Sequence, residues 1–262
     1  MNLFALLGTA VAAIALVSVE EEIEIGRQAN AQVRMEVPEL RDARVMAYVG
    51  AVGARLVASA PGPKYPYTFS VANYREINAS SLPGGPVWIN RGVLQRAARE
   101  SQVAAVLAHE IAHIAERHGS DRLTQGMVAR WGLGLLGALL GNTGGAGTAQ
   151  AAAGLLAGSV FLKFSRDEER EADRVGLAML IRAGWDGRGL IELFDLLRQE
   201  AGRDPGTVDA FLSSHPSPQD RIAALSADVR RHPDGRRDSR QFRNVRLHLE
   251  RLPPPPRVKD NH

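Results

Sequence analysis

The chain has 262 residues, of which 45% are hydrophobic and 23% are charged, as is ordinary for a globular protein with a full core. Its formal net charge is +3, and arginine-rich patches occur only near Arg230–Arg246, which argues against a nucleic-acid partner. The absence of cysteine excludes disulfides, thiolate metal ligands, cysteine nucleophiles and a lipid anchor on an N-terminal cysteine.

The first segment, Met1–Val19, is apolar and has no charged side chain. Nineteen apolar residues are about enough to span a bilayer. Small residues at positions 10, 12, 13 and 15 are typical of a signal-peptide cleavage site. The segment therefore predicts an export signal or an N-terminal membrane anchor, and the alternative is a buried core helix.

Residues 20–118 are expected to alternate between amphipathic helices and short strands. Apolar positions at helical spacing, and the Pro61-Gly62-Pro63 stop, predict helices over Glu20–Glu36, Glu39–Ala60, Arg91–Arg99 and Gln102–His118. Short apolar runs around the turn at Leu82–Pro86 predict strands over Tyr65–Val71, Arg75–Asn78 and Val87–Asn90.

A glycine- and alanine-rich tract at residues 127–162 has two apolar arms, Met127–Leu140 and Ala149–Leu162. Each arm is about 14 residues long, which is too short to span a membrane alone. Two interpretations are open. The tract is either a buried or dimer-forming helical hairpin, or a hairpin that dips into a membrane surface or caps a hydrophobic cleft.

The C-terminal third is predicted to be helical. Expected helices cover Ser165–Arg182, which opens with acidic residues, Gly187–Gln199 and Gln219–Arg230. The Pro253–Pro256 run predicts a disordered tail at 251–262. The chain thus divides into a leader or anchor (1–19), one domain (20–250) and this tail, and the domain is α+β and mostly helical.

The pattern His109-Glu110-Ile111-Ala112-His113 lies within the predicted helix Gln102–His118. Histidines four residues apart project from one helical face, so both imidazoles can bind one metal ion. Glu110 is next to the first histidine, where its carboxylate can reach a water on that ion. This H-E-x-x-H pattern is typical of zinc hydrolases.

A catalytic zinc site requires three protein ligands and an open position for water. The richest source of a third ligand is the acidic start of the helix Ser165–Arg182. Glu169 shares a helical face with Asp173 and Gly176, whereas Glu168 lies on the adjoining face. Spacing alone does not choose between Glu168 and Glu169. Ala172 and Gly176 are small and would let this helix pack closely on the His109 helix.

Four ordered motifs together resemble one family. They are His109-Glu-x-x-His113, Ser165-Arg166-x-x-Glu169-x-x-Ala172-Asp173, Asn78-Ala79 with Leu82-Pro83-Gly84-Gly85, and His215-Pro216 with Asp220-Arg221. This set is similar to zinc metallopeptidases of the CAAX prenyl protease type 1 and HtpX group, and most of all to the exported BepA-like branch. The resemblance covers most of residues 20–225. It does not extend to the tetratricopeptide domain that the BepA-like branch carries.

The resemblance implies a zincin-like domain with one zinc ion. The ligands would be His109, His113 and Glu169. Glu110 would be the general base, and Asp173 would hold the other ring nitrogen of His109. It also implies a small β-sheet whose edge strand borders the active-site helix.

The substrate backbone is expected to pair with Gly85–Asn90 as that edge strand. The candidate substrate-binding residues are Asn78, Gly84, Gly85 and Val87. The family usually has Asn-Ala-Phe-Ala before the Leu-Pro-Gly-Gly turn, and here the sequence is Asn78-Ala79-Ser80-Ser81. The hydrophobic contact that the phenylalanine makes is therefore not expected.

His215 and Arg221 are the candidate donors to the oxyanion that develops during peptide hydrolysis. In the BepA-like branch, the matching histidine is thought to occupy the open position on zinc and keep the enzyme latent. Three roles are therefore open for His215: transition-state donor, removable fourth ligand, or a histidine that only precedes a helix. The remaining histidines, at 118, 232, 248 and 262, are expected on the surface.

The function expected from these motifs is an exported zinc metalloendopeptidase, in the periplasm or anchored facing it, that acts on misfolded or misassembled envelope proteins. The 127–162 tract would give it membrane-surface contact, and no nucleic acid is expected. The alternative is a non-proteolytic chaperone or assembly factor, which would have no need of Glu110. A membrane-embedded prenyl-protein protease is disfavoured because only Met1–Val19 could span a bilayer unaided.

Overall fold

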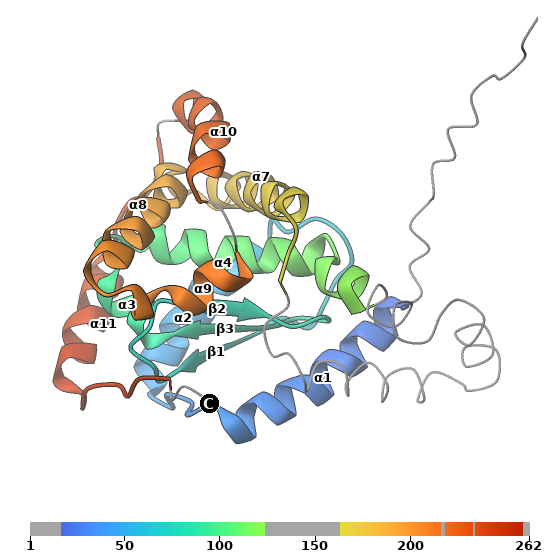
Figure 1. Cartoon of the computed structure of the whole chain (residues 1–262), viewed down its shortest axis with the longest axis horizontal. Coiled ribbons are helices and arrows are strands. Elements are labelled where there is room, and N and C mark those ends of the chain that lie inside the picture. Colours follow the sequence, from blue (N-terminus) through green and yellow to red (C-terminus); the bar gives the residue numbers. More distant parts are fainter. Residues whose placement is uncertain (1–16, 124–162, 216–217, 233, 259–262) are drawn as a thin grey trace, which may run out of the picture.

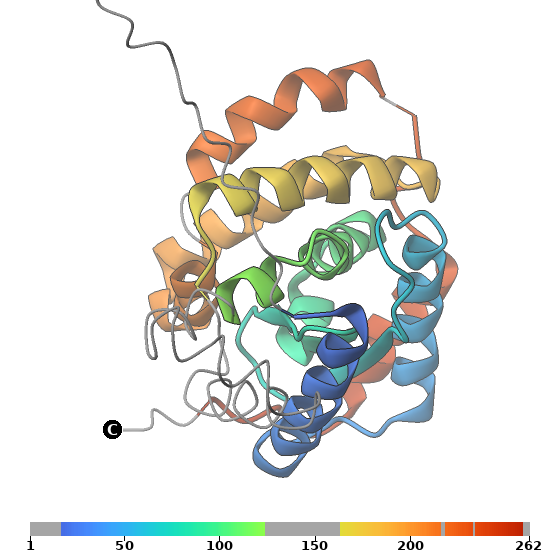
Figure 2. The ribbon, with the colours of Figure 1, turned by 90° about the vertical axis from the view of Figure 1, so that its right-hand side faces the viewer.

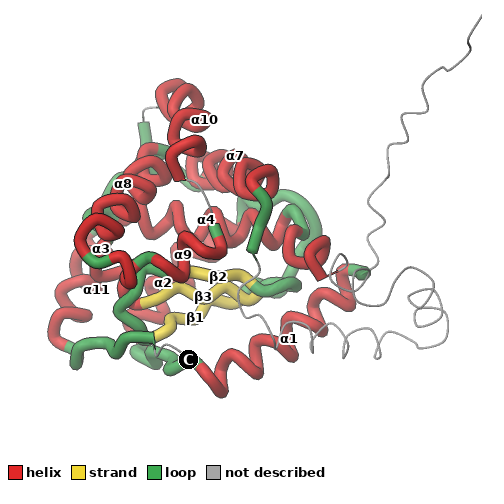
Figure 3. The backbone as a smooth tube through the Cα atoms, in the orientation of Figure 1, coloured by secondary structure: helices red, strands yellow, loops and turns green. Residues whose placement is uncertain are grey.

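The computed structural model describes residues 17–123, 163–215, 218–232 and 234–258. Helices make up most of it, and a small three-stranded sheet lies among them (Figure 3). The expected α+β, mostly helical class is confirmed. The 127–162 tract and residues 1–16 lie outside the described residues. Within the described ranges, no helix combines the length and the apolar character needed to cross a bilayer.

The sheet contains β1 (Thr68–Ala72), β2 (Ala79–Ser81) and β3 (Pro86–Asn90) in the order β1-β3-β2. Strand β3 is parallel to β1 and antiparallel to β2, and all five of its residues are buried. The prediction that Gly85–Asn90 is an edge strand is therefore wrong, because β3 is paired on both sides. Strands β1 and β2 are the two edges of the sheet, and β2 is the edge that borders α4. The strand expected at Arg75–Asn78 begins only at Ala79.

Helices lie around the sheet in the described ranges, and residues 118–123 are helical in addition to the following elements. These elements are α1 (Val19–Glu36), α2 (Ala43–Val57), α3 (Arg91–Arg96), α4 (Glu100–Ala115), α7 (Arg166–Arg182), α8 (Arg188–Arg203), α9 (Asp209–Ser214), α10 (Pro218–Arg231) and α11 (Arg240–Arg251). Helix α4 lies between the sheet and helices α7 and α8 (Figures 1 and 2). All residues of α4 are buried, so the His109 motif is at the centre of the domain.

Helices α4 and α7 approach each other closely because two small residues of α7 face α4. A Cβ atom added at Gly176 would lie 3.3 Å from the backbone of Ala108 and from the nitrogen of His109. Ala172, one turn earlier, has no exposed surface. The expectation that these two small residues permit close packing is confirmed, and larger side chains there would push the helices apart.

The C-terminal region differs from the expectation. Helix α11, which the sequence patterns missed, buries one apolar face in the core. The guanidinium of Arg91, 1% exposed, donates hydrogen bonds to the carbonyls of Leu249 (2.7 Å) and Pro253 (2.8 Å). The carbonyl of Pro256 also accepts a hydrogen bond from a backbone amide of the domain. Pro253 and Pro256, in the segment expected to be a disordered tail, thus hydrogen-bond to the domain.

The β2–β3 turn is held against α1. Gly84 has φ +76°, in the left-handed region that side chains disfavour. A Cβ atom there would lie 2.4 Å from the carbonyl oxygen of Glu22 in α1. Only glycine fits this contact, so packing against α1 explains the glycine at position 84 without any role in substrate binding.

We predict that Gly84→Ala lowers the free energy of unfolding by about 1–3 kcal/mol, because both the backbone conformation and the contact with α1 are strained. The matched control is Gly50→Ala, since Gly50 lies inside α2 with open space where the new Cβ atom would be. That change is expected to stabilise by up to about 1 kcal/mol. Urea denaturation of both variants measures the effects, and equal stability would contradict the packing role.

Candidate metal centre

Four buried donor groups meet where α4, α7 and the end of α9 come together. The Nε2 atoms of His109 and His113 lie 3.1 Å apart. The carboxylate oxygens of Glu169 lie 3.3 Å from Nε2 of His113 and 3.5 Å from Nε2 of His109. Nδ1 of His215 lies 3.3 Å from Nε2 of His109 and 2.9 Å from Glu169. All four side chains are at most 3% exposed.

The spacing of these atoms fits a single metal ion. Zinc binds nitrogen and oxygen at about 2.0–2.1 Å, so neighbouring ligand atoms in a tetrahedral site lie about 3.3–3.4 Å apart. The distances above scatter around that value, and one ligand atom from each of the four residues falls within 4.8 Å of the others. Two imidazoles, a carboxylate and a third imidazole also have the donor chemistry that zinc prefers.

Local structure explains why α7 supplies its carboxylate from Glu169. Ser165 caps α7 in a reciprocal capping box with Glu168, whose side chain also pairs with Arg122. Glu168 is therefore turned away from the histidines. Glu169, one residue further on, is fully buried beside them. The alternative that the sequence left open is thus decided geometrically in favour of Glu169 as the carboxylate in the cluster.

Asp173 lies beside the ring of His109, on the side away from the donor cluster. Its carboxylate lies 3.1 Å from Nδ1 of His109. Nε and Nη2 of Arg221 each donate to Asp173 at 2.6 Å. If Nδ1 of His109 carries the proton and donates it to Asp173, Nε2 presents its lone pair to the cluster. This is the place that the resemblance implied for Asp173.

The charge states of the cluster follow from its burial and pairing. Burial opposes the charged form of Glu169, but its pairing with the three neighbouring histidines outweighs this and holds its pKa well below the usual range. Burial likewise opposes a charged His109, yet Asp173 and Glu169 raise its pKa to about 9. Burial lowers the pKa of His113. Glu169 is therefore an anion, and His113 is a neutral imidazole.

Glu110 is fully buried beside the cluster. The hydroxyl of Ser81, on edge strand β2, donates to Oε2 of Glu110 at 2.9 Å. No residue in the described ranges hydrogen-bonds to Oε1 of Glu110, which lies 3.5 Å from Nε2 of His215. One oxygen is thus anchored to the sheet while the other faces the donor cluster. The sequence marked Ser81 only as a departure from the family pattern.

The candidate substrate residues are held within the fold. The carbonyl of Asn78 accepts a hydrogen bond from Asn90, and Val87 lies on the central strand between β1 and β2. Gly84 and Gly85 form the turn that packs on α1 and on Pro66 respectively. The strand position that reaches Glu110 is Ser81 instead.

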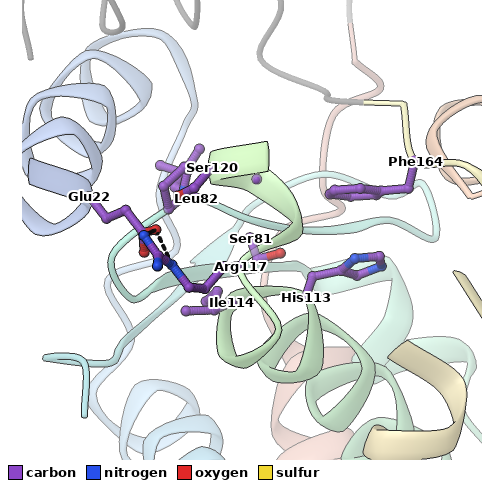
Figure 4. Close-up of a pocket in the computed structure, with 10 residues that line it drawn as sticks. Glu22, Ser81, Leu82, His113, Ile114, Arg117, Ser120 and Phe164 are labelled. Carbon is purple, nitrogen blue, oxygen red and sulfur yellow. Dashed lines mark hydrogen bonds and ion pairs between the residues drawn. The ribbon is translucent and has the colours of Figure 1, made fainter. Parts of the chain in front are cut away.

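Two further side chains near the cluster were not predicted. His118, expected on the surface, is only 2% exposed and lies against His113. Phe164 stacks on the ring of His113 (Figure 4), and the two ring centroids lie 3.8 Å apart. His232 is exposed and His248 is half-buried, while His262 lies outside the described residues.

A narrow pocket opens beside His113, between α1, the β2–β3 turn and Phe164 (Figure 4). Ser81, Leu82 and Ile114 line it, with the ion pair between Glu22 and Arg117 at 2.5 Å on its far side. The pocket therefore brings the edge strand, the α4 motif and the first helix to one place.

Comparisons with known proteins identify one family. The model of peptidase family M48 matches residues 43–229. The beta-barrel assembly-enhancing protease of Escherichia coli K12 is 32% identical over 212 residues, which cover 79% of this chain and 43% of that protein. The mitochondrial metalloendopeptidase OMA1 of Schizosaccharomyces pombe is 33% identical over 178 residues, or 68% of this chain and 51% of that protein. The chain spans about half the length of these relatives.

We predict that Glu169→Ala loses bound metal, whereas Glu168→Ala keeps it. Glu168→Ala should instead lower the free energy of unfolding by about 1 kcal/mol, because it removes one half of the α7 capping box. Metal content of the purified variants measures the first effect and thermal denaturation the second. Metal loss from Glu168→Ala alone would contradict the assignment.

Proposed function

This chain belongs to peptidase family M48, and from that premise we propose that it is a zinc-dependent endopeptidase of the cell envelope, acting on misfolded or misassembled proteins. The observation that carries the proposal is the buried Glu110 beside a four-donor cluster. The relatives' names, which include protease and metalloendopeptidase, support a peptide-bond hydrolase.

His109, His113 and Glu169 would hold the zinc ion. When bound, zinc would supply Lewis-acid chemistry by acidifying a water and polarising the scissile carbonyl. Asp173 fixes the ring of His109, and Arg221 in turn fixes Asp173 and lies 2.5 Å from Glu169. Because the donors of Arg221 are engaged by these carboxylates, we assign it a positioning role in place of the expected oxyanion donor.

Glu110 would be the general base. Its Oε1 would take a proton from the attacking water and later deliver it to the leaving amine. The hydrogen bond from Ser81 to Oε2 holds the carboxylate in place and leaves Oε1 available. A buried carboxylate in this position has a clear use in hydrolysis, whereas a chaperone that only holds clients has no need of it.

Strand β2 is the proposed substrate-binding edge. It pairs with β3 on one side only, so its other side can accept an extended peptide by strand addition. Ser81 is the last residue of this strand and hydrogen-bonds to Glu110, so a peptide paired with β2 would lie next to the base. This role replaces the one predicted for Gly85–Asn90.

His215 is proposed as a removable fourth ligand. Its side chain is 2% exposed, and it contacts Glu169, His109 and Glu110, so the role of a histidine that only precedes a helix does not explain its position. Zinc enzymes need one open position for substrate water, and His215 would fill it in a resting state.

Export is proposed from the apolar segment Met1–Val19, whose first 16 residues lie outside the described ranges. Location in the periplasm, or anchorage facing it, would bring the enzyme to envelope proteins. We further propose that the tract at 127–162, also outside the described residues, contacts a membrane surface, a partner or the domain itself.

Glu110→Gln is expected to lower casein cleavage by about 10²–10⁴-fold, since the amide cannot take the water proton. Zinc content should be unchanged, because Glu110 is not among the ligands. Purified protein and variant are compared in a casein-degradation assay with zinc analysis of the same samples. Equal cleavage by both proteins would remove Glu110 from the mechanism and leave the chaperone alternative.

His215→Ala is expected to retain zinc and to cleave casein faster than the unaltered chain, because the fourth position becomes free for water. Complete loss of metal would instead show that His215 is a permanent ligand. A slower reaction with full zinc content would support the transition-state donor role in place of the resting-state ligand.

A further inference from the structure

His118 forms a second contact chain behind the candidate metal centre. Its Nδ1 lies 2.9 Å from Nδ1 of His113, on the side of that ring opposite the donor cluster. Its Nε2 lies 3.4 Å from a carboxylate oxygen of Glu171. His118 is 2% exposed, whereas Glu171 is 46% exposed. The three side chains thus connect His113 to the surface of α7.

The fold brings His118 to this place by interrupting α4. If the helix continued, His118 would lie about 140° around the axis from His113, because each residue turns 100°. Helix α4 instead ends at Ala115, and Arg117 adopts φ +64° before residues 118–123 resume helical geometry. A positive φ is uncommon for a residue with a side chain.

The side chain of Arg117 holds this reversal. Its guanidinium lies 2.5 Å from Glu22 and donates to the carbonyl of Val17 at 2.5 Å. Glu22 is 1% exposed, so the ion pair is shielded from water on one side. Contacts with α1 and the chain before it therefore fix the turn that returns His118 to His113.

The hydrogen-bond pattern selects one tautomer of His113. Two Nδ1 atoms at 2.9 Å share a single proton, which belongs to either His113 or His118. If His118 donates Nε2–H to Glu171, its Nδ1 is an acceptor. His113 then carries its proton on Nδ1, and its Nε2 presents a lone pair to the donor cluster. The opposite tautomer would place a proton where a metal ion must bind.

We propose that His118 is a positioning residue that fixes the metal-binding tautomer and ring orientation of His113, with Glu171 as its own partner. This inference rests on the proposed metal centre. It gives each histidine of the motif a carboxylate from α7: Asp173 directly for His109, and Glu171 through His118 for His113. Mutation of the hydrogen-bond partner of a metal ligand commonly weakens metal binding by about 10–100-fold.

The test measures zinc affinity of the full chain by competition with a chromogenic chelator. His118→Phe keeps a ring of similar size but removes both nitrogens, and we expect zinc binding to weaken about 10–100-fold. His118→Asn keeps an acceptor oxygen and should restore affinity to within about threefold of the unaltered chain. His232→Phe is the matched control at an exposed histidine and should change nothing.

Glu171→Gln provides a second variant, since its partly exposed side chain can change without loss of the fold, as circular dichroism would verify. We expect it to weaken zinc binding by about two- to fivefold. Unchanged zinc affinity in His118→Phe overturns the proposal. So does a zinc affinity of His118→Asn that is no higher than that of His118→Phe. If His118→Phe does not fold, unchanged affinity in Glu171→Gln overturns it. An unaltered chain that binds no zinc would refute the proposed metal centre instead.

Discussion

The candidate site depends on the close packing of α4 against α7. Gly176 lets the two backbones approach until an added Cβ would lie 3.3 Å from Ala108. At that separation, Glu169 reaches both imidazoles of the motif. Because each helix projects its polar groups from one face at i and i+4, a single interhelical contact aligns the donors of both. A wider spacing would separate the carboxylate from the histidines, whatever the motif.

This packing places strong charges in the core, and they require compensation. Glu110, Glu169 and Asp173 are at most 2% exposed, and the buried guanidinium of Arg221 faces two of them. Three carboxylates against one guanidinium leave two formal negative charges before any histidine is protonated. Buried anions are costly unless they are paired or bind metal. A protonated His109, whose pKa is raised to about 9, offsets one of these charges, and a cation bound by the cluster would offset the rest.

The edge strand connects the sheet to this chemistry. Strand β2 has only three residues, yet its last residue, Ser81, hydrogen-bonds to Glu110. Ser81, which departs from the family pattern, therefore contacts the candidate base Glu110. On the other side of the motif, His118 and Phe164 cover His113, one through a ring nitrogen and the other through its stacked ring. The residues around the motif thus hold both its base and its second histidine.

The sequence by itself determined most of the long helices, although not α11, and the H-E-x-x-H residues, because apolar spacing and the i, i+4 relation are local properties of the chain. It also indicated α7 as the source of a carboxylate. Only the tertiary structure decided between Glu168 and Glu169, since that depends on the capping box and Arg122. The pairing of β3 on both sides and the return of His118 to His113 were likewise decided in three dimensions. Strand order and left-handed turns depend on contacts between distant segments, which local periodicity does not encode.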